Sequence, residues 1–367
     1  MKITCLKSEL LKSINIALRA VPVRSTMPVL ECILIDATHQ DIRFITNDME
    51  MGIETRVQGR ISEPGVLAIN AKMLSDIVRK LPDNNVTISS DENYNVRINC
   101  EKAKFAIGGE SGEDFAYLPV VERDTCVTIS QLALRQVILQ TIFSIASGET
   151  NKLMTGELFE IKNDRLRVIS LDGHRISIRR VDIKESNTNN KVIVPGKTLQ
   201  EISKIMTGDH DDMVNIYITE NHILFEMPDT TIVSRLIDGE YFAVDQMISG
   251  DYESKVKINK KTFQDCIDRA TLFVKEGDKK PIILEFTEGN CNLSIESPLG
   301  AMNEDIDIEK DGKDLTIGFN PRFMIDALKA IEDEDITLYM TNAKSPCFIR
   351  DDEDNYTYLV LPVNFTR

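Results

Sequence analysis

A triplet of basic, acidic and basic residues occurs three times in this 367-residue chain, starting at positions 72, 197 and 322, a constant spacing of 125. The triplets are Lys72–Asp76–Arg79, Lys197–Glu201–Lys204 and Arg322–Asp326–Lys329. An apolar stripe accompanies each triplet, formed by Leu74, Ile77 and Leu81; Leu199, Ile202 and Met206; and Met324, Ala327 and Ile331. At 3.6 residues per turn, stripe and triplet lie on opposite faces of one helix. The pattern therefore predicts three equivalent amphipathic helices, each with two cations on its solvent face.

A repeat of this length has the size of one domain, and the whole chain is too long for one ordinary hydrophobic core. We therefore expect three domains, at residues 1–123, 124–249 and 250–367. Linkers are expected near residues 122–125 and 248–255, where polar and acidic residues interrupt the strand pattern.

Each third of the chain also contains an earlier strand–helix–strand segment, in which apolar and polar residues alternate between short polar turns. Each domain is then two βαβββ units, and the expected fold is α+β, with one helix pair per domain packed on antiparallel sheets. The predicted helical windows are 7–21, 71–82, 130–147, 195–206, 259–275 and 320–330. The predicted strands of the earlier segments are 28–36, 41–46 and 51–57; 156–161, 166–170 and 175–181; and 281–286, 291–296 and 302–308.

All six helical windows are net positive, although the chain carries a formal net charge of −16. Lys and Arg are good helix formers on solvated faces, which would explain one such helix. Six positive windows and the constant phase of the triplets favour another explanation, in which the helices face a polyanion and the acidic sheets outside repel it. Long cationic side chains reach phosphates without reading bases, so such binding is independent of sequence and weakened by salt.

Several other classes of function are not indicated. Seven scattered cysteines without a C-x-x-C pair favour reduced thiols in the cytoplasm over disulfides or a zinc site. No apolar run reaches the ~18–20 residues that span a bilayer, so no membrane partner is expected. The Gly196-Lys197-Thr198 turn lacks the first glycine of a phosphate-binding loop, and His174 has no nucleophile indicated nearby. We expect no enzyme activity, no metal and no cofactor.

The chain resembles the β subunit of bacterial DNA polymerase III, the sliding-clamp family. The matching segments are spread over the whole length in the order of the family, and together they are specific although each is weak alone. They are Met1-Lys2-Ile3-Thr4, Arg24-Ser25-Thr26-Met27-Pro28-Val29-Leu30, Thr46-Asn47-Asp48-Met49-Glu50, Asp172-Gly173-His174-Arg175, Leu236-Ile237-Asp238-Gly239-Glu240, Gly318-Phe319-Asn320 and Tyr358-Leu359-Val360-Leu361-Pro362-Val363.

The resemblance implies a DNA sliding clamp: a non-enzymatic processivity factor in which a head-to-tail homodimer closes a ring of six domains around duplex DNA. Helices would line the central hole, and antiparallel sheets would lie outside. The implied partners are double-stranded DNA, bound topologically and without sequence preference, a second copy of the chain, the DNA polymerase III catalytic subunit, the clamp loader complex, and other DNA polymerases and repair proteins with a short clamp-binding peptide. The implied location is the cytoplasm, in association with the nucleoid.

The family pattern also implies a hydrophobic cleft for that peptide, with a few polar groups for orientation. Of the three equivalent turns in the repeat, only the second contains a glycine followed by His-Arg. By position, the cleft contains Met154, Leu171, Gly173, His174, Arg175, Ile176, Phe242, Gln246, Met247, Lys344, Leu361, Pro362, Val363, Asn364 and Phe365. Some positions differ from the usual pattern of the family, which bears on peptide preference: Phe242-Ala243-Val244, Gln246, Asn364 and the extension Thr366-Arg367.

The remaining candidate residues belong to the DNA surface and the dimer seam. Arg24 comes from the resemblance, and Lys12 and Arg19 share an outward helix face seven residues apart. The DNA candidates are Lys12, Arg19, Arg24, Lys72, Arg79, Lys197, Lys204, Arg322 and Lys329. For the seam, the resemblance points to Phe105, Leu272 and Phe273, and the alternative for each aromatic residue is an ordinary core position.

Two other functions stay open at this point. A polyanion-binding repeat protein could use the basic helices as an open groove; it would be a stable monomer that binds linear and circular DNA alike. A hydrolase or nucleotide-binding enzyme would show turnover or nucleotide affinity that is lost on His174→Ala or Lys197→Ala.

Overall fold

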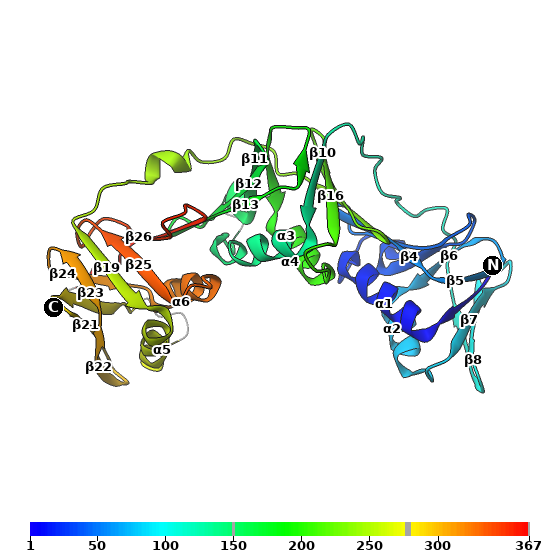
Figure 1. Cartoon of the computed structure of the whole chain (residues 1–367). Helices are drawn as coiled ribbons and strands as arrows, with labels where there is room; N and C mark the ends of the chain where they lie inside the picture. Colours follow the sequence, from blue (N-terminus) through cyan, green and yellow to red (C-terminus); the bar gives the residue numbers. More distant parts are fainter. Residues whose placement is uncertain (149–150, 276–279, 366–367) are drawn as a thin grey trace. The chain divides into compact units, whose positions relative to one another are not determined.

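The computed structural model describes residues 1–148, 151–275 and 280–365 (Figure 1). The predicted extension Thr366-Arg367 lies outside the described residues. The chain forms two compact units: unit 1 comprises residues 1–132, 184–188 and 204–236, and unit 2 comprises residues 133–183, 189–203 and 237–367.

Six α-helices occur in the described residues, one in each predicted window. They are α1 (Lys7–Ala17), α2 (Ala71–Lys80), α3 (Gln131–Leu139), α4 (Gly196–Ile205), α5 (Lys260–Thr271) and α6 (Pro321–Ala330). Three begin at an asparagine whose side chain accepts a backbone N–H of the first turn, at Asn70, Asn259 and Asn320. Such a cap satisfies one of the orphan donors at a helix start, and typically contributes about 1 kcal/mol.

The apolar stripes predicted from the repeat are buried in α2, α4 and α6, and all nine stripe residues belong to the core. Helix α1 packs against α2, and α5 packs against α6. In α3 and α4, Arg135 Nε donates to the Ser203 carbonyl at 3.1 Å. Burying a Leu, Ile or Met side chain stabilises a fold by about 1.5–3 kcal/mol, so the stripes determine which helix face points outward.

Unit 1 contains a five-stranded sheet in the order β5-β1-β7-β8-β9 and a nine-stranded sheet in the order β14-β10-β16-β17-β18-β4-β3-β2-β6, both antiparallel. The strands are β1 (Lys2–Leu6), β2 (Cys32–Asp36), β3 (Ile42–Asn47), β4 (Met51–Val57), β5 (Gly59–Glu63), β6 (Val66–Asn70), β7 (Asn85–Ser90), β8 (Asn95–Cys100), β9 (Ala103–Gly108), β10 (Cys126–Ser130), β14 (Glu185–Ser186), β16 (Met213–Ile218), β17 (His222–Glu226) and β18 (Thr230–Arg235).

Unit 2 repeats this plan with a four-stranded sheet, β22-β21-β20-β24, and a nine-stranded sheet, β15-β11-β12-β13-β27-β26-β25-β19-β23. The strands are β11 (Gly156–Lys162), β12 (Arg165–Leu171), β13 (Arg175–Asp182), β15 (Asn190–Pro195), β19 (Ser254–Asn259), β20 (Ile282–Thr287), β21 (Asn290–Ser297), β22 (Gly300–Asp307), β23 (Glu309–Gly312), β24 (Leu315–Phe319), β25 (Asp335–Met340), β26 (Cys347–Arg350) and β27 (Tyr356–Val360).

The structure differs from the sequence expectation in two local features. Residues 28–31, predicted as the start of a strand, form a short 3₁₀ helix, because Pro28 fixes its own backbone at the first helical position. Each third also has a short strand that was not predicted. These strands, β5, β14 and β23, pair with the first strand of their own third, β1, β10 and β19.

Glu157 in β11 is a buried acid without an obvious role in packing. It is 0% exposed, and within the described residues neither carboxylate oxygen makes a hydrogen bond of ordinary geometry. Burial raises the pKa of Glu157 well above its usual value, and the neighbouring Thr141 hydroxyl offsets this only in part. The Thr141 hydroxyl itself donates to the Val137 carbonyl at 2.7 Å. Glu157 therefore favours the protonated form in the folded chain.

We expect Glu157→Met to stabilise the protein at pH 8 by about 1–3 kcal/mol, the cost of an unpaired buried polar group. The pKa is higher in the folded than in the unfolded chain. Stability is therefore greatest below the unfolded pKa and falls as the pH rises toward the folded pKa. The stability gained by Glu157→Met should therefore be smaller at pH 4 than at pH 8. Denaturant unfolding of both proteins at the two pH values measures the difference, and an equal gain at both would contradict this explanation.

Candidate nucleic-acid and peptide interfaces

The nine candidate DNA residues are all exposed. Six of them are the cations of the triplets, two to a helix in α2, α4 and α6, on the faces opposite the buried stripes. Lys12 lies on α1, and Arg19 lies in the 3₁₀ turn Leu18–Ala20 that continues it. Arg24 lies in an exposed loop beside Val23, which is 96% exposed. The nine cations therefore lie at the surface, and the buried helix faces fix the backbone positions of the six in the triplets.

The acidic residues of the triplets differ in their surroundings. Asp76 is exposed on α2. Asp326 on α6 is 37% exposed, and its Oδ2 accepts a hydrogen bond from Arg175 Nη1 at 2.6 Å. The sequence did not predict this pair, because the two residues are 151 positions apart.

The turn that connects β12 to β13 is closed by an aspartate side chain. Asp172 Oδ1 accepts the backbone N–H of His174 at 2.9 Å and that of Arg175 at 3.2 Å. Gly173 has a φ of +86°, a left-handed conformation that costs glycine little. The glycine therefore suits the turn that the sequence singled out.

The first third of the chain contains the same turn with different side chains. Asp48 Oδ1 accepts the N–H of Glu50 at 3.1 Å and that of Met51 at 2.8 Å. Met49 holds the left-handed position, with a φ of +74°. By this correspondence, Arg175 stands in the place of the buried Met51. This replacement is a further sequence signal for Arg175, beside the glycine followed by His-Arg in its turn.

Four predicted cleft residues meet in one hydrophobic cluster of unit 2. Leu171 and Ile176 are buried in it, and Met154 and Phe242 pack against it partly buried. The cluster also contains core residues from β11, β12, β13, β25, β26 and β27. Met247 is 47% exposed. We call the exposed side of this cluster, together with the turn 172–175 and residues 361–365, the peptide surface.

Residues 361–365, the C-terminal tail, are held by two backbone hydrogen bonds. Leu361 N donates to the His174 carbonyl and Val363 N donates to the Gly318 carbonyl, each at 2.8 Å. A Cβ at Gly318 would lie 2.8 Å from Phe365 Cδ1, so glycine permits the tail to approach β24 closely. Of the other predicted cleft residues, Pro362 is half-buried and Asn364 is exposed, while Lys344 is exposed in the turn between β25 and β26.

The segment 242–247 is fixed by an arginine on the neighbouring strand. Arg167 on β12 pairs with Asp245 at 2.6 Å and with Glu160 at 2.9 Å. The hydrogen bond from Arg167 lowers the pKa of the Asp245 carboxyl. Gln246 follows directly and is exposed. Arg167 therefore positions the backbone that carries Gln246 and Met247.

The candidate seam residues lie on an edge strand or just after helix α5. Strand β9 ends the five-stranded sheet, and its Phe105 is 37% exposed. Strand β22 ends the four-stranded sheet. Leu272, just after α5, is 76% exposed, while Phe273 is partly buried against the core and would lie 3.0 Å from a Cβ at Gly300. Within the described residues, each unit thus has an unpaired edge strand, with Phe105 on β9 and Phe273 close to Gly300 of β22.

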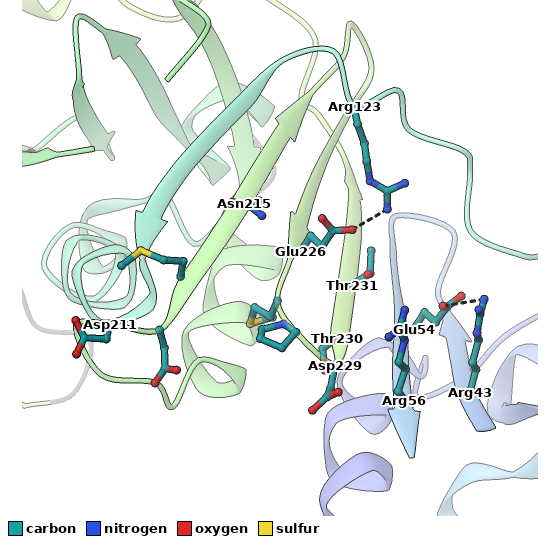
Figure 2. Close-up of a pocket in the computed structure, with 14 residues that line it drawn as sticks. Arg43, Glu54, Arg56, Arg123, Asp211, Asn215, Glu226, Asp229, Thr230 and Thr231 are labelled. Atoms are coloured by element: carbon teal, nitrogen blue, oxygen red, sulfur yellow. Dashed lines mark hydrogen bonds and ion pairs between the residues drawn. The ribbon is translucent and has the colours of Figure 1, made fainter. Parts of the chain in front are cut away.

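A polar pocket of about 640 Å³ lies elsewhere, on the nine-stranded sheet of unit 1 (Figure 2). Four of its charged side chains form two ion pairs: Arg43 with Glu54 at 3.4 Å, and Arg123 with Glu226 at 2.8 Å. Figure 2 shows Arg43 and Glu54 on the neighbouring strands β3 and β4, and Arg123 on the loop before β10, opposite Glu226 of β17. Arg56, Asp211, Asp212 and Asp229 also line the pocket, so its lining contains more acidic than basic side chains.

Two kinds of site are not found in the part of the chain that the structure describes. It contains no group of three or more His, Cys, Asp or Glu side chains placed to hold a metal ion. None of its helices is both long and apolar enough to cross a bilayer.

Comparison with known proteins identifies the family to which this fold belongs. Sequence models of the N-terminal, central and C-terminal domains of the DNA polymerase III beta subunit match residues 1–119, 128–242 and 245–364. The beta sliding clamp of Staphylococcus epidermidis is 31% identical, over 99% of both chains.

Similarity to solved structures supports the same family. The structure of a putative DNA polymerase III beta subunit from Eubacterium rectale has a TM-score of 0.97 and 61% identity, over 100% of this chain and 99% of that one. The DNA polymerase sliding clamp of Bacillus subtilis has a TM-score of 0.96 and 32% identity, over 100% of both chains. The fold and its exposed basic helices thus define a sliding clamp. The chain belongs to the DNA polymerase III beta subunit family.

Membership of this family confirms the predicted fold class and the predicted function of a DNA sliding clamp. The family consists of non-enzymatic processivity factors, so the hydrolase alternative is rejected and the open-groove alternative is not favoured. The identity implies DNA, polymerase-related proteins and a second copy of the chain as partners.

Proposed function

We propose that two copies of this chain close head to tail into a ring around duplex DNA, and that the ring holds replication and repair proteins by short peptides. The observation that carries the proposal is the repeat itself. Three helices in the same phase expose pairs of cations, while their opposite faces are buried. The bounds that we propose for the three domains are 1–123, 124–249 and 250–367.

Contacts between the nine exposed cations and phosphates would hold the DNA without reading its sequence. We expect Lys72→Ala to weaken equilibrium binding to duplex DNA and to lower the slope of log affinity against log salt by about 1 for each lost phosphate contact. Lys162→Ala is the matched control, because Lys162 is also exposed but ends strand β11 instead of lying on a basic helix. An unchanged slope in Lys72→Ala, or an equal change in the control, would contradict the assignment.

The two unpaired strand edges support the head-to-tail contact. Lys102 and Lys104 lie at β9, whereas Glu304, Asp305 and Asp307 lie on β22. Pairing β9 of one copy with β22 of the next would satisfy both edges and join opposite charges. Two such contacts, one at each end of the chain, close a ring of two copies.

The peptide surface supports the second half of the proposal. It combines half-buried apolar side chains with backbone groups of the tail, the combination that captures an extended peptide. We propose that the DNA polymerase III catalytic subunit, the clamp loader complex and other DNA polymerases and repair proteins bind there. The proposed location is the cytoplasm, in association with the nucleoid.

A primer-extension assay tests the tethering function. The substrate is a singly primed circular template, with a compatible polymerase and clamp loader. Adding this chain should lengthen the products of a single binding event, because a tethered polymerase rebinds before it diffuses away. Product lengths that do not change would contradict the proposal.

A further inference from the structure

Arg175 connects three segments of unit 2 through one guanidinium group. Its Nε donates to Asp172 Oδ2 at 3.0 Å, its Nη1 to Asp326 Oδ2 at 2.6 Å, and its Nη2 to the carbonyl of Phe143. The side chain is only 11% exposed. Each guanidinium nitrogen therefore already has a partner inside the protein, which is not what a side chain reserved for a bound peptide would show.

Aromatic contacts connect the same turn to α6. The guanidinium carbon of Arg175 lies 4.4 Å from the centroid of the Phe323 ring and 5.4 Å from that of Phe143. The His174 ring stacks on the same Phe323 ring, with centroids 6.0 Å apart. Phe323 and Asp326 are three residues apart and lie on one side of α6, whereas Arg322 and Lys329 are exposed.

The tail depends on the same turn. Leu361 N donates to the carbonyl of His174, so a displacement of residues 172–175 moves the start of the tail as well. A binding surface loses affinity when its supporting groups move by more than about 0.5 Å. The chain of contacts therefore runs from Asp326 through Arg175 to the turn, and from the turn to the tail.

We infer that Arg175 is a positioning residue that ties the peptide surface to helix α6, so that affinity for a partner peptide depends on Asp326, a residue outside that surface. Asp326 lies between Arg322 and Lys329 on α6. The same helix thus carries cations proposed to contact DNA and the acid that holds Arg175 beside the peptide surface. The inference rests on the proposed function, because it takes residues 172–175 and 361–365 as parts of the peptide surface.

The repeat supplies matched variants for the test. Asp326→Ala removes the partner of Arg175, and Asp76→Ala removes the acid at the same position of the first triplet. Arg175→Met replaces the guanidinium with the side chain that the first third has there, Met51. The probe is a fluorescein-labelled synthetic peptide with the clamp-binding sequence of a DNA polymerase III catalytic subunit, and its affinity is measured by fluorescence anisotropy.

We expect Asp326→Ala to weaken peptide binding by about fivefold or more, the lower end of the usual coupling between sites, and Asp76→Ala to change it less than twofold. In the Arg175→Met background, Asp326→Ala should have little further effect, because both changes remove the same contact. The melting temperature and the dimer mass of each variant are measured alongside. If Asp326→Ala caused a general loss of structure, the melting temperature and the dimer mass would fall together with peptide affinity. The loss of affinity would then add to the loss caused by Arg175→Met.

Two results would overturn the inference: peptide affinity of Asp326→Ala within twofold of the unmodified chain, or effects of the two substitutions that multiply in the double variant. They would leave the proposed peptide surface intact if the unmodified chain binds the probe and a chain ending at Val360 does not. Failure of the unmodified chain to bind the probe would overturn the proposed peptide surface, and the inference with it.

Discussion

Phe105→Asp is expected to convert the dimer into monomers. The substitution places a carboxylate at an unpaired strand edge that we propose to be buried against β22 of the partner, beside the acidic side chains of that strand. An unpaired charge in such a contact costs about 2 kcal/mol or more, and a closed ring contains two copies of the seam. The dimer dissociation constant should therefore rise by about a thousandfold. Sedimentation velocity across a range of protein concentrations measures the change.

Val120→Asp is the control for this experiment. Val120 is 98% exposed and lies outside the strands of the same third of the chain. The control should keep the dimer mass of the unmodified chain. A Phe105→Asp protein that stays dimeric at low micromolar concentration would move the seam away from β9. A folded Phe105→Asp monomer with unchanged circular dichroism would support a seam at β9.

Ending the chain at Val360 is expected to abolish peptide binding while the ring persists. The deletion removes the tail and its hydrogen bonds to His174 and Gly318, and with them one side of the peptide surface. Loss of a wall that carries several apolar contacts costs about 3 kcal/mol, which is more than a hundredfold in affinity. Fluorescence anisotropy with the labelled polymerase peptide measures this loss.

The ring provides the control for the truncation, because β9, β22 and the basic helices lie outside the deleted residues. Dimer mass and retention on circular DNA should match those of the full chain. Peptide affinity within twofold of the full chain would reject the tail as part of the peptide surface. Loss of the dimer together with peptide binding would instead show that the tail is needed for folding.

Local patterns in the sequence predict the helices and the nine strands of the earlier segments well, because each depends on residues that are near in the chain. The apolar stripes place α2, α4 and α6 with the correct face inward. Alternation places β11, β12 and β13 to within a residue or two of their bounds. The strands β5, β14 and β23 are missed because they are mostly exposed and lack a clear alternation of apolar and polar residues.

Pairing between distant strands could not be predicted in the same way. Strand β18 pairs with β4, and β13 pairs with β27, so that both nine-stranded sheets combine strands from different thirds of the chain. An edge strand carries no local signal for its partner, since backbone hydrogen bonds are available to any strand of suitable direction. The division of the chain into two compact units follows from these pairings.

The candidate sites show the same limit. The exposed cations follow from helix periodicity alone. The role of Arg175 does not, because its partners Asp326 and Phe143 meet it only through the fold. The buried Glu157 follows Gly156 at the start of a strand, and no sequence pattern marks it as an acid without a partner. Contacts between distant residues therefore account for most of what the sequence did not reveal.

Release from DNA after linearisation tests the central claim most directly. The protein is loaded onto nicked circular DNA with a compatible clamp loader, and the circle is then cut once at constant salt. A closed ring that slides should stay on the uncut circle and leave the linear product through its ends. Equal retention on the linear product would mean direct binding along an open groove, and would contradict encirclement.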